Sequence, residues 1–475
     1  MNFIKLSLAT CVALAGLSTI SSAQPLEEAI KGIDVSGMLR YRYTDDRYKN
    51  QRYTKDDSAS IRGQGGASKG SAKHEWRAEA LFKTPVINNI SMNLGVYYGG
   101  SNDVNHGKGT SGANNNNTST SNGFIGSGLG AGSDGRFGVR EFTATITPDT
   151  TSTTFKLGKM PLLTPLNDSD DRGTGVFITN SDIDNWSFAA GAFDSWSLDD
   201  GVPNGDGGSV AKPYYTLAAL SNYDTSIGNF STQLWLYYIQ DIADFIGFGE
   251  LTWDNNMVSL TGQYAYSKLD NSGPLSTNTN SNSMWNYKPK TANDLYTLGA
   301  GLDFSDFNVP VALNVGYWGN TQDGYAVSLD NEGGFLKAGQ LWFSNPATGV
   351  NISMFNVGGG AMPKGYEKNK LSAFYANLNH DILDNLNIGI DYVQGKNKLT
   401  RGLSNAKSSG NVSFYEISPN LTWQYSKSLT ISSYYSFLQS KAQRSIRSSV
   451  GDASVANSTN KEKFNELRVE VKYLF

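Results

Sequence analysis

Apolar and polar residues alternate along the first and the last segments of the chain that read as strands. In residues 33–43 the apolar side chains fall mainly at odd positions, while Arg40 and Arg42 occupy even ones. Residues 466–475 repeat the pattern and end at Phe475. Successive side chains of a strand point to opposite faces, so each segment predicts one apolar and one charged face. A strand at the end of the chain would leave an open edge, and pairing the last strand with the first removes it.

Similar alternation recurs through the chain, with aromatic pairs near the expected strand ends, as in the girdles of membrane barrels. Short and long connections alternate between these segments. The short ones are residues 85–91, 381–385 and 426–428, and the long ones are 99–135, 270–291, 323–364 and 439–461. We therefore predict an all-β fold, a transmembrane antiparallel β-barrel of about 16–18 strands with long external loops and short periplasmic turns. The alternative is a soluble β-sandwich.

The amino-terminal residues predict export. Lys5 precedes an uncharged, apolar stretch at 6–20, and small residues at 21–23 suit signal peptidase. We expect a signal peptide over residues 1–23 and one barrel domain over 24–475, the alternative being a membrane anchor. The only cysteine, Cys11, lies in the signal, so the mature chain would have no disulfide and no reactive thiol.

The composition excludes several functional classes. The net charge is −4, which argues against nucleic-acid binding. Mean hydropathy is −0.39 and no apolar run after the signal could form a membrane-spanning helix. Of three histidines, His74 and His380 lie at a strand start and a turn, and only His106 with Asp103 could form a catalytic pair. With no catalytic motif present, we do not expect an enzyme.

Residues 160–175 are the best candidate for a loop that folds into the lumen and sets the width of a pore. Two prolines and an exit glycine shape the segment, which carries a run of charges. Carboxylates there would concentrate cations, and basic groups facing the lumen by strand parity would lie opposite. The predicted constriction comprises Asp168, Asp170, Asp171 and Arg172 with Arg40, Arg42, Arg77 and Lys156. The alternative is that the aspartates form a solvated turn.

Several short blocks resemble the Campylobacter-type major outer membrane protein family. They are residues 25–31, 34–37, 39–43, 173–176 and 233–236, together with the closing strand. The resemblance implies a barrel of about 18 strands, a homotrimer, and a general diffusion pore of mild cation preference for small hydrophilic solutes and ions. It places the chain in the outer membrane of a Gram-negative bacterium, in contact with membrane lipid and lipopolysaccharide.

The resemblance also implies a calcium ion held by acidic residues near the constriction. The gapped match suggests Asp170 or Asp171, Asp200 or Asp206, and Asp330 or Glu332 as ligands, although each could be an ordinary loop residue. Two other functions remain open, a substrate-specific channel and a surface adhesin or structural barrel with a closed pore. Single-channel conductance separates the three.

Overall fold

A computed structural model gives the fold. It describes residues 32–49, 70–105, 135–168, 170–198, 210–273, 275, 291–330, 334–343, 345, 347–355, 366–403, 406–443 and 461–475. The expected signal peptide and the block at 25–31 lie outside these residues. No helix in the described part of the chain is long and apolar enough to cross a membrane.

Within these residues, eighteen antiparallel strands form one sheet. They are β1 (Asp34–Lys49), β2 (Gly70–Lys83), β3 (Ile90–Asn105), β4 (Gly135–Ile146), β5 (Thr153–Pro161), β6 (Arg172–Asn180), β7 (Trp186–Ser197), β8 (Tyr214–Thr225), β9 (Gly228–Ile239), β10 (Ala243–Asp254), β11 (Val258–Leu269), β12 (Ala292–Asp303), β13 (Val311–Gly319), β14 (Tyr366–Leu383), β15 (Leu386–Leu403), β16 (Ala406–Gln424), β17 (Leu429–Ala442) and β18 (Lys461–Leu474). A short 3-10 helix, η1 (Ser305–Phe307), lies between β12 and β13.

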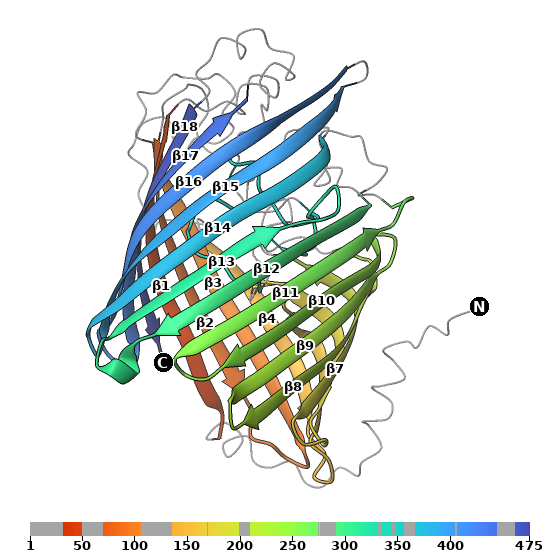
Figure 1. Cartoon of the computed structure of the whole chain (residues 1–475). Helices are drawn as coiled ribbons and strands as arrows, with labels where there is room; N and C mark the ends of the chain where they lie inside the picture. The colour runs from red at the N-terminus through yellow and green to blue at the C-terminus, as the bar shows by residue number, and fades with distance from the viewer. Residues whose placement is uncertain are drawn as a thin grey trace.

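The sheet closes on itself because β1 pairs with β18, and each other strand pairs with its neighbours in sequence (Figure 1). The register sets Arg42 beside Glu470 and Tyr43 beside Val469, so charged and apolar faces of the two strands coincide. The chain end is tied to β1 by two main-chain hydrogen bonds between Gly37 and Phe475, of 2.9 and 3.2 Å. A side chain at Gly37 would collide with the Phe475 ring. The predicted closed barrel is confirmed.

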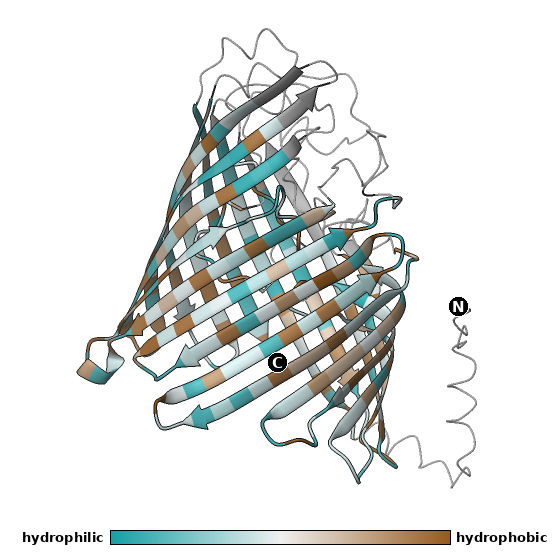
Figure 2. Cartoon of the chain, turned by 45° about the vertical axis from the view of Figure 1, so that its right-hand side comes forward, coloured by the Kyte–Doolittle hydropathy of each residue, from teal (hydrophilic) through white to brown (hydrophobic). Residues whose placement is uncertain are grey.

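Alternation of the two faces is visible along the strands (Figure 2). On β1, the side chains of Val35, Leu39 and Tyr41 are exposed on the outside of the barrel. The intervening Arg40 and Arg42 face the lumen, where they approach Glu470. This arrangement shows apolar groups to lipid and charges to water, as expected for a membrane barrel.

Connections at the lower end of the barrel in Figure 1 are short, and the long ones lie at the opposite end. The wall is uneven in height. Strands β14 and β15 have 18 residues each and β16 has 19, whereas β5 and β6 have 9 each. The long strands therefore extend furthest toward the end with long connections, and we call the part of the barrel around β14–β16 the tall wall.

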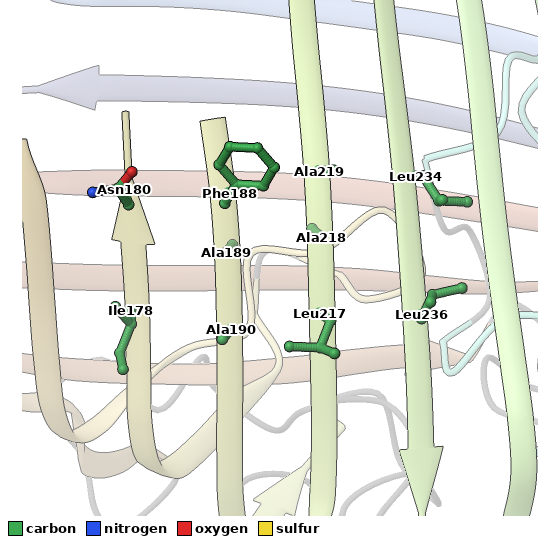
Figure 3. A pocket seen from close by; sticks show the side chains of 10 residues that line it. All are labelled: Ile178, Asn180, Phe188, Ala189, Ala190, Leu217, Ala218, Ala219, Leu234 and Leu236. Carbon is green, nitrogen blue, oxygen red and sulfur yellow. The ribbon is translucent and has the colours of Figure 1, made fainter. Parts of the chain in front are cut away.

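A shallow apolar depression lies on the outer face of the barrel over β6–β9, the shorter part of the wall, which we call the low wall (Figure 3). Ala190 and Ala219 lie at its floor and larger side chains at its rim. The lining residues are Ile178, Asn180, Phe188, Ala189, Ala190, Leu217, Ala218, Ala219, Leu234 and Leu236.

Candidate functional site

The loop between β5 and β6, residues 162–171, folds into the barrel. Leu162 and Leu166 are 1% and 0% exposed and belong to the apolar cluster inside the lumen. Two side-chain hydrogen bonds of 2.7 Å fix the loop, from the Thr164 hydroxyl to Asn167 Oδ1 and from Asn167 Nδ2 to Asp171 Oδ2. Buried apolar anchors and internal hydrogen bonds make this a shaped loop with a defined position.

Asp170 projects from this loop onto the barrel wall. Arg77 of β2 donates two hydrogen bonds to its carboxylate, of 2.6 and 3.0 Å. Arg140 of β4 also pairs with Asp170, and Arg172 lies 3.7 Å away. Glu79 pairs with both Arg77 and Arg140. These residues form one ion-pair network, which we call the eyelet cluster: Arg77, Glu79, Arg140, Asp170 and Arg172.

Burial raises the pKa of Asp170, but the hydrogen bond from Arg77 and the charges of Arg77, Arg140 and Arg172 outweigh it, so the pKa lies below its ordinary value. The carboxylate therefore stays ionised at neutral pH. A bidentate arginine–carboxylate pair also has a fixed geometry, so it holds the loop against β2.

A second group of charges lies beside the eyelet cluster on the same wall. Arg42 of β1 donates from Nε to Glu470 of β18 at 2.8 Å, and Arg40 lies 4.0 Å from the same carboxylate. The register also places Arg40 directly opposite Arg77. Five guanidinium groups therefore face three carboxylates over these two groups.

The other residues of the predicted constriction have different positions. Lys156 faces the lumen, since it pairs in register with Thr145, but the described residues include no contact between it and the cluster. Asp168 and Asp171 turn back into their own loop, where Asp168 Oδ1 accepts from Asp170 N at 2.8 Å. Asp171 is completely buried. Acidic and basic groups thus meet in direct contact at Asp170, rather than facing each other across water.

Three members of these charge groups were missed by sequence reasoning. Glu79 and Glu470 lie two residues after Arg77 and Arg468 and therefore on the same faces, so extending the same alternation would have found them. Arg140 is different because it lies at a bulge, where Glu141 pairs with Gly95 and Val139 with Val96. A bulge breaks the two-residue period, so parity could not place Arg140.

The connection between β13 and β14 does not lie outside the barrel as the prediction of an external loop at 323–364 required. Its described residues fold into the lumen and pack against the inner faces of the strands. The Trp342 ring lies 4.9 Å from that of Trp318 on β13 and 5.9 Å from that of Phe414 on β16. Burial of these aromatic groups overcomes the polarity that the loop's composition suggested. We call residues 320–330, 334–343 and 347–355 the plug.

Luminal side chains anchor the plug through its main chain. The Glu416 carboxylate on β16, fully buried, accepts hydrogen bonds from the amides of residues 340, 341 and 342, at 2.5 to 3.1 Å. Asp294 on β12 accepts from Thr321 N at 2.9 Å. Gln263 on β11 donates to Gly334 O and accepts from Leu336 N, each at 2.8 Å. Buried polar groups on both sides are thereby satisfied.

The plug divides the lumen into two unequal environments. Toward β7–β16 the inner faces are covered, with side chains such as Phe248 and Val393 at 0% exposure. Toward β1, β2, β4 and β18 several charged side chains stay partly accessible, such as Glu470 at 15% and Arg42 at 24%, although Glu466 is buried. Charges are retained where water reaches them, so the polar passage follows this second wall.

The described residues do not fit the implied calcium ion. They contain no group of three acidic, histidine or cysteine side chains able to hold a metal. Asp170 is surrounded by three arginines, and Asp171 accepts from Asn167 and from Asp168 N. Asp330 lies beside the main chain of Leu166. Asp200, Asp206 and Glu332 lie outside the described residues.

The histidines have local partners. His74 Nδ1 lies 2.8 Å from the Tyr41 hydroxyl, and His380 Nδ1 lies 2.9 Å from Pro310 O. The pairing of His106 with Asp103 lies outside what the structure describes, because His106 and the Asp103 side chain are not placed.

A closed membrane barrel with in-folded loops and a charged passage defines an outer-membrane channel of the porin class. The chain belongs to the Campylobacter major outer membrane protein family, whose model matches residues 1–473. It is an outer-membrane porin of a Gram-negative bacterium.

Solved structures share the barrel fold. OpdQ of Pseudomonas aeruginosa is 12% identical, with a TM-score of 0.52 over 93% of this chain and 99% of that one. OccAB1 of Acinetobacter baumannii is 14% identical, with a TM-score of 0.54 over 93% and 96%. OpdK of Pseudomonas aeruginosa, solved with vanillate, is 11% identical, with a TM-score of 0.53 over 93% and 98%. No curated protein matches the sequence.

Proposed function

We propose that this porin is a passive pore through which small hydrophilic solutes and ions diffuse along the wall formed by β1–β4 and β18. The observation that carries the proposal is the accessible charged wall beside a lumen otherwise filled by the plug. Charges of both signs keep water in such a passage. The loop at 162–171 narrows it, because the hydrogen bond between Arg77 and Asp170 holds the loop inside the barrel.

The expected mild cation preference gains no support from the eyelet cluster. Asp170 is compensated by arginines, and within the eyelet cluster and the adjacent group of Arg40, Arg42 and Glu470 guanidinium groups outnumber carboxylates by five to three. This excess favours a second candidate function, a channel that prefers small anionic solutes. Carboxylates bind guanidinium groups in a bidentate manner, so an aromatic carboxylate such as vanillate is a suitable probe.

Single-channel recording of the purified mature protein in planar bilayers tests both functions. A passive pore gives steady steps that scale with salt concentration. The sign of the reversal potential in a KCl gradient gives the ion preference, and concentration-dependent block by vanillate identifies an anion-selective channel. A barrel that inserts without conductance is a structural barrel or an adhesin, and would overturn the proposal.

We further propose that the exported chain, after removal of residues 1–23, assembles as a homotrimer through its low wall. The support is the apolar depression over β6–β9, where alanines permit close approach. A cysteine in place of Leu217, unique in the mature chain, should form dimeric and trimeric products with a short crosslinker. A cysteine at Leu378, on the outer face of the tall wall, is the matched control. The outer faces would otherwise contact membrane lipid and lipopolysaccharide.

A further inference from the structure

The outer face of the tall wall changes from apolar to basic toward the end with long connections. Cross-strand pairing defines successive lateral rows over β15, β16 and β17. One row holds Tyr392, Ile417 and Phe437, the next holds Gln394, Tyr415 and Gln439, and the third holds Lys396, Ser413 and Lys441. Lys398 and Lys463 lie on the same face. Apolar, aromatic, amide and ammonium groups thus follow one another along the wall.

Rows this far apart match the layers of a membrane leaflet. Ile417 and Ser413 are four residues apart, which is about 13 Å along a strand and about 10 Å along the membrane normal at the usual tilt. The headgroup layer begins where the hydrocarbon ends and is about 5–8 Å thick on each side. If the row of Ile417 lies at the edge of the hydrocarbon, the lysine side chains reach the headgroups.

Some lysines on this face have another lysine as their partner on the neighbouring strand. Lys441 pairs in register with Lys461, and Lys398 with Lys370, whose ammonium group also donates to the carbonyls of Thr321 and Gln322. Like charges directly opposite each other destabilise a sheet. We call the exposed lysines Lys396, Lys398, Lys441 and Lys463 the basic belt.

Nearby carboxylates do not compensate the belt. Asp323 is paired with Lys368 at 2.9 Å, and Asp45 with Arg47 at 2.9 Å. Within the described part of the chain, no carboxylate forms an ion pair with any of the four belt lysines, all of which are exposed. The four ammonium groups are therefore available to anions from outside the protein.

We propose that the basic belt binds the phosphate groups of the phosphorylated glycolipid of the outer leaflet. This inference rests on the proposed contact with outer-membrane lipid and assigns it to named residues. The acyl chains would lie against Ile417 and Phe437, while Ser413 offers a hydrogen bond to the sugar. Two ammonium groups on adjacent strands suit a phosphate, which carries more than one negative charge.

The test compares two triple variants of the full mature protein. Lys396→Gln, Lys441→Gln and Lys463→Gln together remove three charges from the belt. Lys212→Gln, Lys268→Gln and Lys427→Gln remove three charges elsewhere, two of which are already paired with Asp241 and Asp244. Both are reconstituted in nanodiscs with diphosphorylated lipid A, and retained lipid is counted by native mass spectrometry. Lipid A without phosphates and inorganic phosphate alone serve as separate probes.

Each belt lysine is expected to contribute about fivefold in affinity, so the belt variant should bind lipid A roughly a hundredfold more weakly than the control variant. Wild-type binding should weaken at high salt and should require the lipid phosphates. Equal binding by both variants, or equal binding of dephosphorylated lipid, overturns the proposal. Binding of inorganic phosphate as tight as that of lipid A would assign the belt to a soluble anion instead.

Bilayer conductance of the same samples keeps the two proposals separate. The belt lies on the outer face, so both variants should conduct as the wild type does. Loss of lipid A binding in the belt variant, with normal conductance, supports both the lipid site and the proposed pore. Normal lipid binding without conductance in any sample would refute the proposed pore and leave the belt in place.

Discussion

Replacing Asp170 with asparagine removes one negative charge from the eyelet cluster with almost no change in side-chain size. Two hydrogen bonds to Arg77 and the ion pairs with Arg140 and Arg172 then lose their anionic partner. The eyelet cluster then holds three guanidinium groups and one carboxylate, that of Glu79. The expected result is a shift of ion preference toward anions.

The size of the shift follows from Coulomb's law. A permeating ion about 7 Å from the lost charge, in water, would feel about 0.6 kcal/mol, which screening at 0.1 M salt reduces to about 0.3 kcal/mol. Cations lose this energy and anions gain it, so the permeability ratio of cations to anions should fall about threefold. At 0.01 M salt the longer Debye length makes the expected change about fivefold.

Reversal potentials in KCl gradients measure this ratio. Asp224→Asn is the matched control, because Asp224 is exposed near the end of β8, remote from the cluster in the chain, and its substitution should leave the ratio unchanged. A ratio equal to that of the wild type in both salts would refute the reasoning, since it would mean that permeating ions do not pass near Asp170.

Three other predictions concern pH, the plug and calcium. The pKa of Asp170 lies below its ordinary value of 3.8, so the stabilising effect of its carboxylate should be fully present above that pH and be lost as pH falls through the folded-state pKa. The melting temperatures of wild type and Asp170→Asn should therefore differ by a constant amount from pH 7 to 5 and converge below about pH 4. Glu416→Gln should cost about 2 kcal/mol, because a charged acceptor of three amides is lost, and should increase current noise as the plug loosens; an unchanged noise spectrum would count against the anchoring role. Removal of calcium should change the melting temperature equally in wild type and Asp170→Asn, since the ion does not fit at Asp170, and a change confined to the wild type would contradict this.

Sequence reasoning predicted the barrel because its signal is local and repeated. The alternation in β1 and β18 is visible over ten residues, and the charges at Arg42 and Glu470 fall on matching faces when the strands pair. Lipid on one side and water on the other impose this two-residue period on every strand. The number of strands could be bounded but not fixed, because long connections and strand extensions look alike in sequence.

The plug could not be predicted from loop length and polarity alone. The connections at 99–135, 270–291 and 439–461 and the connection that forms the plug are all rich in glycine, asparagine and serine. One signal was nevertheless present, the apolar run at residues 341–343, with Ile352 and Met354 a little further on. A loop surrounded by water has no reason to carry such residues, so they indicated a buried segment.

The loop at 162–171 connects the two environments of the lumen. Its Leu166 carbonyl accepts from the amide of Leu329 at 3.0 Å and from the Ser328 hydroxyl at 3.1 Å, both in the plug. Four residues later, Asp170 is held by Arg77 on the accessible wall. Since the same short loop is fixed at both points, a displacement of the plug must either strain the loop or move Asp170 away from Arg77. The packing of the apolar half therefore sets the geometry of the charged half, and substitutions in the plug should alter ion preference although none of its residues belongs to the eyelet cluster.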